Sequence, residues 1–270
     1  MPREQRQNAP SPQANDANAF EQGWHKRFSQ YAEHHEDDAS IAGWSTTGLE
    51  ARIRQFRRSF PPAIDGERWL DAGCGAGTYS RYLASLGASV LGVDYSFRTV
   101  EKAKSRDGQG VSFCVADATA LPVRAGSFDG ALSLGVTQAL SRSERLVTAL
   151  AQSVRPGGQV WIDGLNAWCF VHVLSEARRK ARGWPRYLRY ETPGGIKRLL
   201  RAQGFTELRV FWLPIMPSRL QRLQRLIETS AVRLLFRVVP PLGALLSHSF
   251  IVRGAKVCQR RSTQADAGFS

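Results

Sequence analysis

The residue types best suited to holding a ligand gather in residues 69–78. An apolar run there ends in Asp71, after which Gly73, Gly75 and Gly77 alternate with small residues and a helical pattern begins. Glycine has no Cβ, so it allows a tight strand-to-helix turn and lets the backbone approach a bound ligand closely. The free amide groups at the start of the following helix favour polar or anionic ligand groups.

The spacing of this turn separates two kinds of nucleotide cofactor. The dinucleotide fingerprint has its third glycine three residues after the second, whereas here Gly77 comes two residues after Gly75 and position 78 is threonine. Asp71 stands two residues before the first glycine, where a carboxylate suits a cationic group better than a pyrophosphate. S-adenosylmethionine carries an ammonium and a sulfonium group, whereas NAD carries two phosphates. The turn therefore favours the former.

Aspartates also end the next two apolar runs, at Asp94 and Asp117. Alternating strand and helix patterns predict a parallel, doubly wound sheet, in which ligands bind beyond the carboxyl ends of the strands. Each aspartate could instead be an ordinary cap or turn residue, but caps need not recur at three successive strand ends. The predicted strands are 68–72, 88–94, 111–117, 128–134, 159–164, 205–214 and 249–257.

With these positions in place, the chain resembles the class I S-adenosylmethionine-dependent methyltransferases, of the type 11 kind. The likeness covers about residues 66–165 and includes Leu121-Pro122, Phe128-Asp129 and the Arg-Pro-Gly-Gly at 155–158. It implies a Rossmann-like, mostly parallel seven-stranded sheet whose last strand is antiparallel, and S-adenosyl-L-methionine as cofactor. In the family, the acid matching Asp94 holds the ribose hydroxyls, and the Asp-Ala pair matching Asp117 and Ala118 contacts the adenine. The implied cofactor-binding residues are Asp71, Ala72, Gly73, Cys74, Gly75, Gly77, Asp94, Tyr95, Asp117, Ala118 and Leu134.

The rest of the chain divides around this core. Residues 1–18 are rich in Gln, Asn, Pro and Ala and are expected to form a disordered tail, as is the polar end at 259–270. Residues 19–62 have a helical pattern with Trp24, Phe28 and Tyr31 on one face, which either packs on the core, forms a lid over the ligand cleft, or does both. The methyltransferase domain is expected over 63–258.

Positive charge is concentrated near the carboxyl end. The net charge is +14, and residues 176–261 hold 19 Lys and Arg against 4 Asp and Glu. Within this region, residues 218–248 form an insertion before the last strand, with leucines on one side of a helical wheel and arginines on the other. A basic amphipathic helix suits an anionic membrane interface. The alternative is a helical pair packed on the core with an arginine-rich outer face. Nucleic acid is a less suitable partner because few aromatics interleave with the basic residues.

Four widely spaced cysteines and a polar start without an apolar leader indicate a cytoplasmic protein with reduced thiols, peripheral on the membrane if the insertion binds it. No metal site is expected, because the cluster at 34–38 consists of consecutive side chains that do not converge on one point. The sequence does not settle the oligomeric state.

Methyl transfer mainly requires alignment of donor and acceptor, with a general base only if the acceptor must lose a proton. His172, a titratable group in an apolar segment after the fifth strand, is the leading candidate base; the other candidates by position are His25, Tyr31, Gln138 and Tyr190. The sequence thus predicts a methyltransferase acting on a small or lipid-like acceptor, with O-, N-, C- and S-methylation all open. The alternatives are a non-catalytic scaffold of the same fold and a NAD-dependent oxidoreductase.

Overall fold

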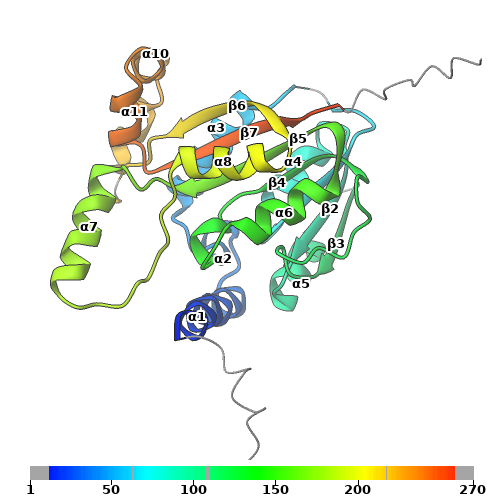
Figure 1. The fold of residues 1–270 in the computed structure, drawn as a ribbon, viewed down its shortest axis with the longest axis horizontal. Coiled ribbons are helices and arrows are strands. Elements are labelled where there is room, and N and C mark those ends of the chain that lie inside the picture. The colour runs from blue at the N-terminus through cyan, green and yellow to red at the C-terminus, as the bar shows by residue number, and fades with distance from the viewer. Residues whose placement is uncertain (1–11, 63, 107–109, 217, 259–270) are drawn as a thin grey trace, which may run out of the picture.

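A computed structural model describes residues 12–62, 64–106, 110–216 and 218–258. Seven strands of this described chain form one sheet in the order β3-β2-β1-β4-β5-β7-β6 (Figure 1). The first five are parallel, whereas β7 runs antiparallel to both β5 and β6. The strands are β1 Arg68–Ala72, β2 Ser89–Asp94, β3 Val111–Val115, β4 Phe128–Ser133, β5 Val154–Leu165, β6 Phe205–Leu213 and β7 Ser249–Lys256. This is the Rossmann-like fold that the sequence predicted.

Helices cover both faces of the sheet and its carboxyl edge. They are α1 Pro12–His34, α2 Asp38–Ile41, α3 Thr46–Ser59, α4 Thr78–Ala84, α5 Phe97–Ser105, α6 Glu144–Ser153, α7 Phe170–Ala181, α8 Pro193–Ala202, α9 Gln224–Ile227, α10 Ser230–Val238 and α11 Pro240–Leu246, with 3-10 turns at Thr137–Ala139 and Ser218–Leu223. In the described part of the chain, no helix combines the length and the apolarity that a bilayer crossing requires.

The core lies on the two sides of the sheet because consecutive residues of a strand face opposite ways. Trp69 of β1 packs in an aromatic layer with Phe56 of α3 and Trp161 of β5, together with apolar residues of α4 and α5. Leu70 faces the other way, into a layer filled from α6 and α8. Gly130 of β4 leaves room for the Trp69 ring of β1, since a Cβ at Gly130 would lie 2.4 Å from that ring.

Three features differ from the sequence prediction. Strand β5 begins at Val154, five residues before the predicted start at 159. Residues 12–18, assigned to the disordered tail, form the first turns of α1, while residues 1–11 and 259–270 lie outside the described residues. The expected amphipathic helix of the 218–248 insertion is instead broken into a 3-10 turn and the short helices α9, α10 and α11. Pro240 and Pro241 stand at the start of α11, where proline is tolerated but cannot continue a preceding helix.

Candidate functional site

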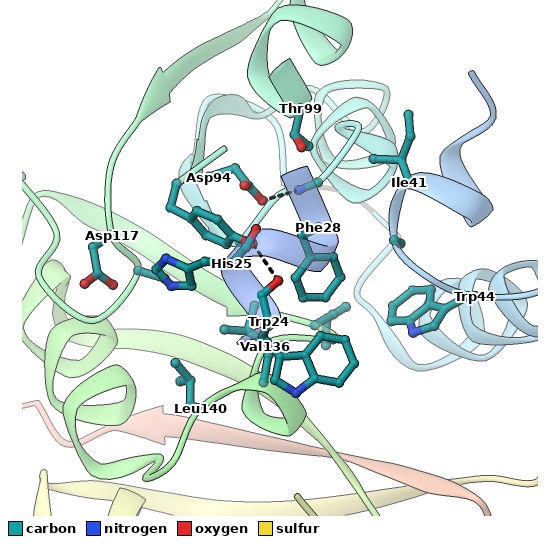
Figure 2. Close-up of a pocket in the computed structure, with 18 residues that line it drawn as sticks. Trp24, His25, Phe28, Ile41, Trp44, Asp94, Thr99, Asp117, Val136 and Leu140 are labelled. Carbon is teal, nitrogen blue, oxygen red and sulfur yellow. Dashed lines mark hydrogen bonds between the residues drawn. The ribbon is translucent and has the colours of Figure 1, made fainter. Parts of the chain in front are cut away.

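The carboxyl ends of β1, β2 and β4 open on a cavity of about 750 Å³, counting its open mouth. We call it the edge cavity, and Figure 2 shows it with its lining side chains. Its floor comes from the loops after these strands and its roof from α1, α2 and Trp44. Its lining residues are Trp24, His25, Phe28, Ile41, Ala42, Trp44, Gly73, Gly75, Asp94, Tyr95, Thr99, Asp117, Ala118, Leu134, Gly135, Val136, Ala139 and Leu140.

The glycine turn supplies backbone at the surface of this cavity. Gly73 has φ +79° and Gly75 has φ +53°, a region that side-chain-bearing residues seldom adopt. A Cβ at Gly73 would lie 2.2 Å from Val136 Cγ2, whereas one at Gly75 would meet nothing within 4 Å. Gly75 therefore faces open space, which a ligand can use. Gly77 lies behind the turn and begins α4 with φ +83°.

Asp94 and Asp117 both line the edge cavity, and Figure 2 shows the two carboxylates with His25 between them. The Asp94 carboxylate accepts hydrogen bonds from the backbone N–H groups of Gly75 (3.1 Å) and Ser96 (2.9 Å), which fix its orientation. Burial nevertheless raises its pKa, and these two hydrogen bonds work in the opposite direction.

Asp71 is placed differently from the sequence expectation. Its side chain does not line the edge cavity; it lies buried beneath the glycine turn and accepts a 2.6 Å hydrogen bond from the Ser80 hydroxyl. Burial raises the pKa of Asp71 to about 7, and the neighbouring Asp94 charge adds to the effect. A direct contact of Asp71 with a cationic ligand is therefore not present in this arrangement, and its visible role is to tie β1 to α4.

The roof is held down by several contacts from α1 and α2. The Tyr95 hydroxyl donates to the backbone carbonyls of Trp24 and His25, and the His25 ring stacks on the Tyr95 ring with centroids 4.0 Å apart. From α2, Asp38 forms ion pairs with Arg81 (2.5 Å) and Arg106 (2.7 Å). These contacts place α1 and α2 as a cover over the edge cavity.

A buried ion pair connects this cover to the floor. Arg52 of α3 donates to the Asp163 carboxylate of β5 at 3.0 Å, and both side chains are only 4% exposed. The other Asp163 oxygen accepts from the Gly135 N–H at 2.7 Å. The Arg52 guanidinium also lies over the Trp44 ring, 4.4 Å from its centroid. One charged pair thus fixes both Gly135 and Trp44, which pack closely together, since a Cβ on Gly135 would lie 2.4 Å from the Trp44 ring.

A second cavity, which we call the lid cavity, adjoins the first and shares Trp24, Ala42 and Trp44 with it. Most of its wall is apolar or aromatic, and His248 enters it from the carboxyl side of the chain. Its remaining lining residues are Tyr31, Gly43, Ser45, Gly48, Arg52, Gln138, Leu165, Tyr187, Leu188, Ile215 and His248.

Seven of the residues expected to bind the cofactor line the edge cavity. They are Gly73, Gly75, Asp94, Tyr95, Asp117, Ala118 and Leu134. Asp71, Ala72, Cys74 and Gly77 lie behind this surface and shape the turn. Among the candidate bases, His25 lines the edge cavity, and Tyr31 and Gln138 line the lid cavity.

His172 lines neither cavity. Its side chain is buried, its Nδ1 lies 2.8 Å from the Asn166 carbonyl, and its ring packs between Tyr190 and His248. His248, which is not among the candidate bases predicted from the sequence, lines the lid cavity instead. The signal was available, because His248 directly precedes the strand expected to be antiparallel, whose first residues must lie at the carboxyl edge of the parallel strands.

The charged side chains that line the edge cavity are acidic. Two carboxylates line it, and no lysine or arginine does so among the described residues. Such a surface favours a ligand that carries positive charge and hydroxyl or amino donors, and it disfavours a diphosphate. The aromatic roof offers flat apolar surfaces and limits access of water.

Comparison with known proteins gives matches in the same region. Residues 70–162 match the model of a family described as a methyltransferase domain. The ubiquinone biosynthesis O-methyltransferase of Methylocella silvestris is 31% identical over 166 residues, 57% of this chain and 62% of that protein. The one from Aromatoleum aromaticum is 32% identical over 151 residues, 52% of this chain and 64% of that protein. The chain thus spans less than two thirds of these relatives.

Solved structures share the fold at low identity. An S-adenosylmethionine-dependent methyltransferase from Mesorhizobium loti gives a TM-score of 0.57 at 20% identity, covering 76% of this chain and 98% of that one. Magnesium protoporphyrin IX methyltransferase from Synechocystis, solved with bound S-adenosylhomocysteine, gives 0.57 at 16% identity, covering 90% and 99%. At these identities the likeness establishes the architecture of the chain.

Proposed function

We propose that the chain transfers a methyl group from S-adenosylmethionine to a small or lipid-like acceptor, because residues 70–162 match the model of a methyltransferase domain. The observation that carries this proposal is the edge cavity: a glycine turn, two carboxylates and no lining lysine or arginine, beneath an aromatic roof. The relatives named as O-methyltransferases support an oxygen atom as the methyl acceptor.

The residues present fit this cofactor. Asp94, already fixed by two backbone N–H groups, has lone pairs left for the ribose hydroxyls. Asp117 keeps one carboxylate oxygen for an adenine amino group, because only its Oδ1 is engaged, by the Thr119 N–H at 2.7 Å. Gly75 leaves open space beside the turn. When bound, the cofactor supplies a methyl carbon made electrophilic by its sulfonium; the chain's task is to align the acceptor with it and exclude water.

Calorimetric titration with S-adenosylhomocysteine tests the cofactor site, and incubation with labelled S-adenosylmethionine and a cell extract tests the activity. We expect saturable binding and a labelled product of low molecular mass. Binding without transfer to any component would favour the non-catalytic scaffold. The oxidoreductase alternative would require NAD to bind instead, and the lining of the edge cavity offers no cation for its diphosphate.

We also propose that the insertion docks the enzyme on an anionic membrane. Two of its polar side chains turn inward: Gln224 is buried and donates to the Pro214 carbonyl, and Glu228 pairs with Arg54 of α3 at 2.8 Å. Phe236 is buried, but many other apolar side chains turn outward, with Leu234 59% and Val238 70% exposed. An exposed apolar face of this size is unusual on a soluble protein. The other exposed apolar residues of the insertion are Leu220, Leu223, Leu226, Leu235, Val239, Leu245 and Leu246.

The start of α7 extends this face. Asn166 donates to the carbonyls of Ala244 and Ser247 and so holds the beginning of α7 beside the end of α11. Figure 1 shows α7, α10 and α11 at the same end of the molecule, away from the sheet. Exposed arginines on the insertion, including Arg222, Arg225 and Arg237, give the charge that attracts anionic lipid. The proposal places the protein in the cytoplasm, peripheral on the membrane.

Liposome flotation tests this docking. We expect the chain to float with vesicles of phosphatidylglycerol and phosphatidylcholine, less with phosphatidylcholine alone, and to lose flotation on Leu234→Asp with Leu235→Asp. Phe97→Asp is the matched control, because Phe97 is equally exposed but lies on α5. Equal flotation of the double variant and the control would exclude the insertion as the contact surface.

A further inference from the structure

His248 lies at the carboxyl edge of the sheet, and the topology explains why. Because β7 is antiparallel to β5, its first residues lie at the carboxyl edge of the parallel strands, with Ser249 paired to Leu165. The His248 carbonyl accepts from the Asn166 N–H at 2.9 Å, which fixes the backbone at this point. The side chain lines the lid cavity, which shares Trp24, Ala42 and Trp44 with the edge cavity.

The His248 imidazole is held without a partner of its own. Its Nδ1 makes no hydrogen bond to any described residue and is closed off from solvent, so the Nε2 side of the ring is the part that lines the lid cavity. The His172 ring contacts it edge-on, with centroids 4.5 Å apart. Burial, together with the charges of Arg52 and His172, lowers the pKa of His248 to about 3, so that the ring is neutral and has a free lone pair at neutral pH. A buried polar group without a partner in a native fold calls for an explanation.

Most other polar groups of the lid cavity are already engaged. Arg52 is paired with Asp163, the Ser45 hydroxyl caps α3 through the Gly48 N–H, and the Tyr31 and Tyr187 hydroxyls are hydrogen-bonded to each other. The remaining wall is largely apolar. The cavity thus suits a ligand with an apolar body and a hydrogen-bond donor directed at His248, with the Gln138 amide as a second polar group of the wall.

Building on the proposed function, we propose that the lid cavity binds the methyl acceptor and that His248 accepts the hydrogen of its O–H group. In the reaction, the acceptor oxygen forms a bond to the methyl carbon while the carbon–sulfur bond breaks and its electron pair passes to sulfur. The acceptor proton passes to the His248 imidazole. The positive charge lost at the sulfonium therefore appears on the imidazolium, which releases the proton to water before the next turnover.

The first test uses the full chain with ¹⁵N-labelled histidine, saturated with S-adenosylhomocysteine, with the His248 ring signals assigned through His248→Leu. The probes are 4-octylcatechol and 1,2-dimethoxy-4-octylbenzene, which share an apolar body but differ in the O–H groups. We expect the catechol to shift the His248 nitrogen signals and the dimethoxy compound to leave them in place. His34→Gln should retain the response, because His34 is exposed on α1 and lines neither cavity.

The second test measures affinity and rate. His248→Leu should weaken 4-octylcatechol binding about tenfold, the effect of one buried hydrogen bond, and leave the dimethoxy compound unchanged. Methyl transfer to the catechol should fall about 100-fold or more. S-adenosylhomocysteine affinity should be the same in all variants, which separates this proposal from the cofactor site and confirms folding.

Three results would overturn the proposal: no catechol binding, unchanged His248 signals on binding, or equal transfer rates in wild type and His248→Leu. Each would leave the proposed function standing if S-adenosylhomocysteine still binds and the extract is still labelled. Loss of cofactor binding by the wild-type chain, in contrast, would remove the proposed function itself.

Discussion

Substitution of Asp94 is the most direct test of how the cofactor is held. The carboxylate faces the edge cavity and is already oriented by the N–H groups of Gly75 and Ser96. Two ribose hydroxyls donating to this ionised group would contribute about 1.5–3 kcal/mol each. Because water can replace part of this in an open cavity, we take about 3 kcal/mol for the pair. Asp94→Ala should therefore raise the dissociation constant of S-adenosylhomocysteine more than 100-fold.

Two companion variants make the measurement specific. Asp94→Asn keeps one oxygen for a backbone N–H and should fall between wild type and Asp94→Ala. Asp117→Ala should cost only about tenfold, because the Asp117 side chain is exposed and one of its oxygens is taken by Thr119. Isothermal titration calorimetry gives the affinities, and a thermal unfolding scan of each apo variant shows that it folds. Wild-type affinity in a folded Asp94→Ala variant would refute the reasoning.

Three further outcomes follow from the buried charges. Asp163→Ala should lower the unfolding free energy by about 3–5 kcal/mol, because it leaves Arg52 unpaired. Adding Arg52→Met should restore part of the lost unfolding free energy in the double variant. Additive effects of the two substitutions in urea denaturation would contradict a coupled pair. Asp71 has a folded pKa of about 7, above its unfolded value of 3.8, so its contribution to the unfolding free energy is complete at low pH and is lost as the pH rises. The unfolding free energy should therefore fall by at most about 4 kcal/mol between pH 4 and 7. Asp71→Asn should reduce this dependence on pH, and an unchanged dependence would argue against a buried carboxyl group. His248 has a folded pKa of about 3 against 6.5 unfolded, so its contribution to stability is complete above pH 6.5 and falls as the pH drops toward 3. His248→Leu should reduce this loss of unfolding free energy in acid, which urea titrations at pH 4 to 7 can measure.

The sequence by itself determined the sheet and the edge of the sheet at which the edge cavity opens. Local periodicity predicts strands, and the bounds of β2 were predicted to within one residue. Strand ends of a parallel sheet share one edge, so Asp94 and Asp117 could be placed together from their positions alone. The N-terminal aromatics were predicted to pack on the core, to cover the cleft, or both, and Trp24 and Phe28 line the edge cavity.

Only the tertiary structure decided which way individual side chains turn and what covers them. Asp71 pairs in register with Gly92, two residues before Asp94, and its carboxylate accepts a hydrogen bond from Ser80 of α4 under the turn. The helical wheel of the insertion has an apolar side in the sequence, but the sequence does not say whether that side faces the core or the solvent. The ion pair between Glu228 and Arg54 of α3 directs the apolar side outward. His248 gained its place from the pairing of β7 with β5. These outcomes depend on contacts between segments far apart in the chain, which local pattern does not encode.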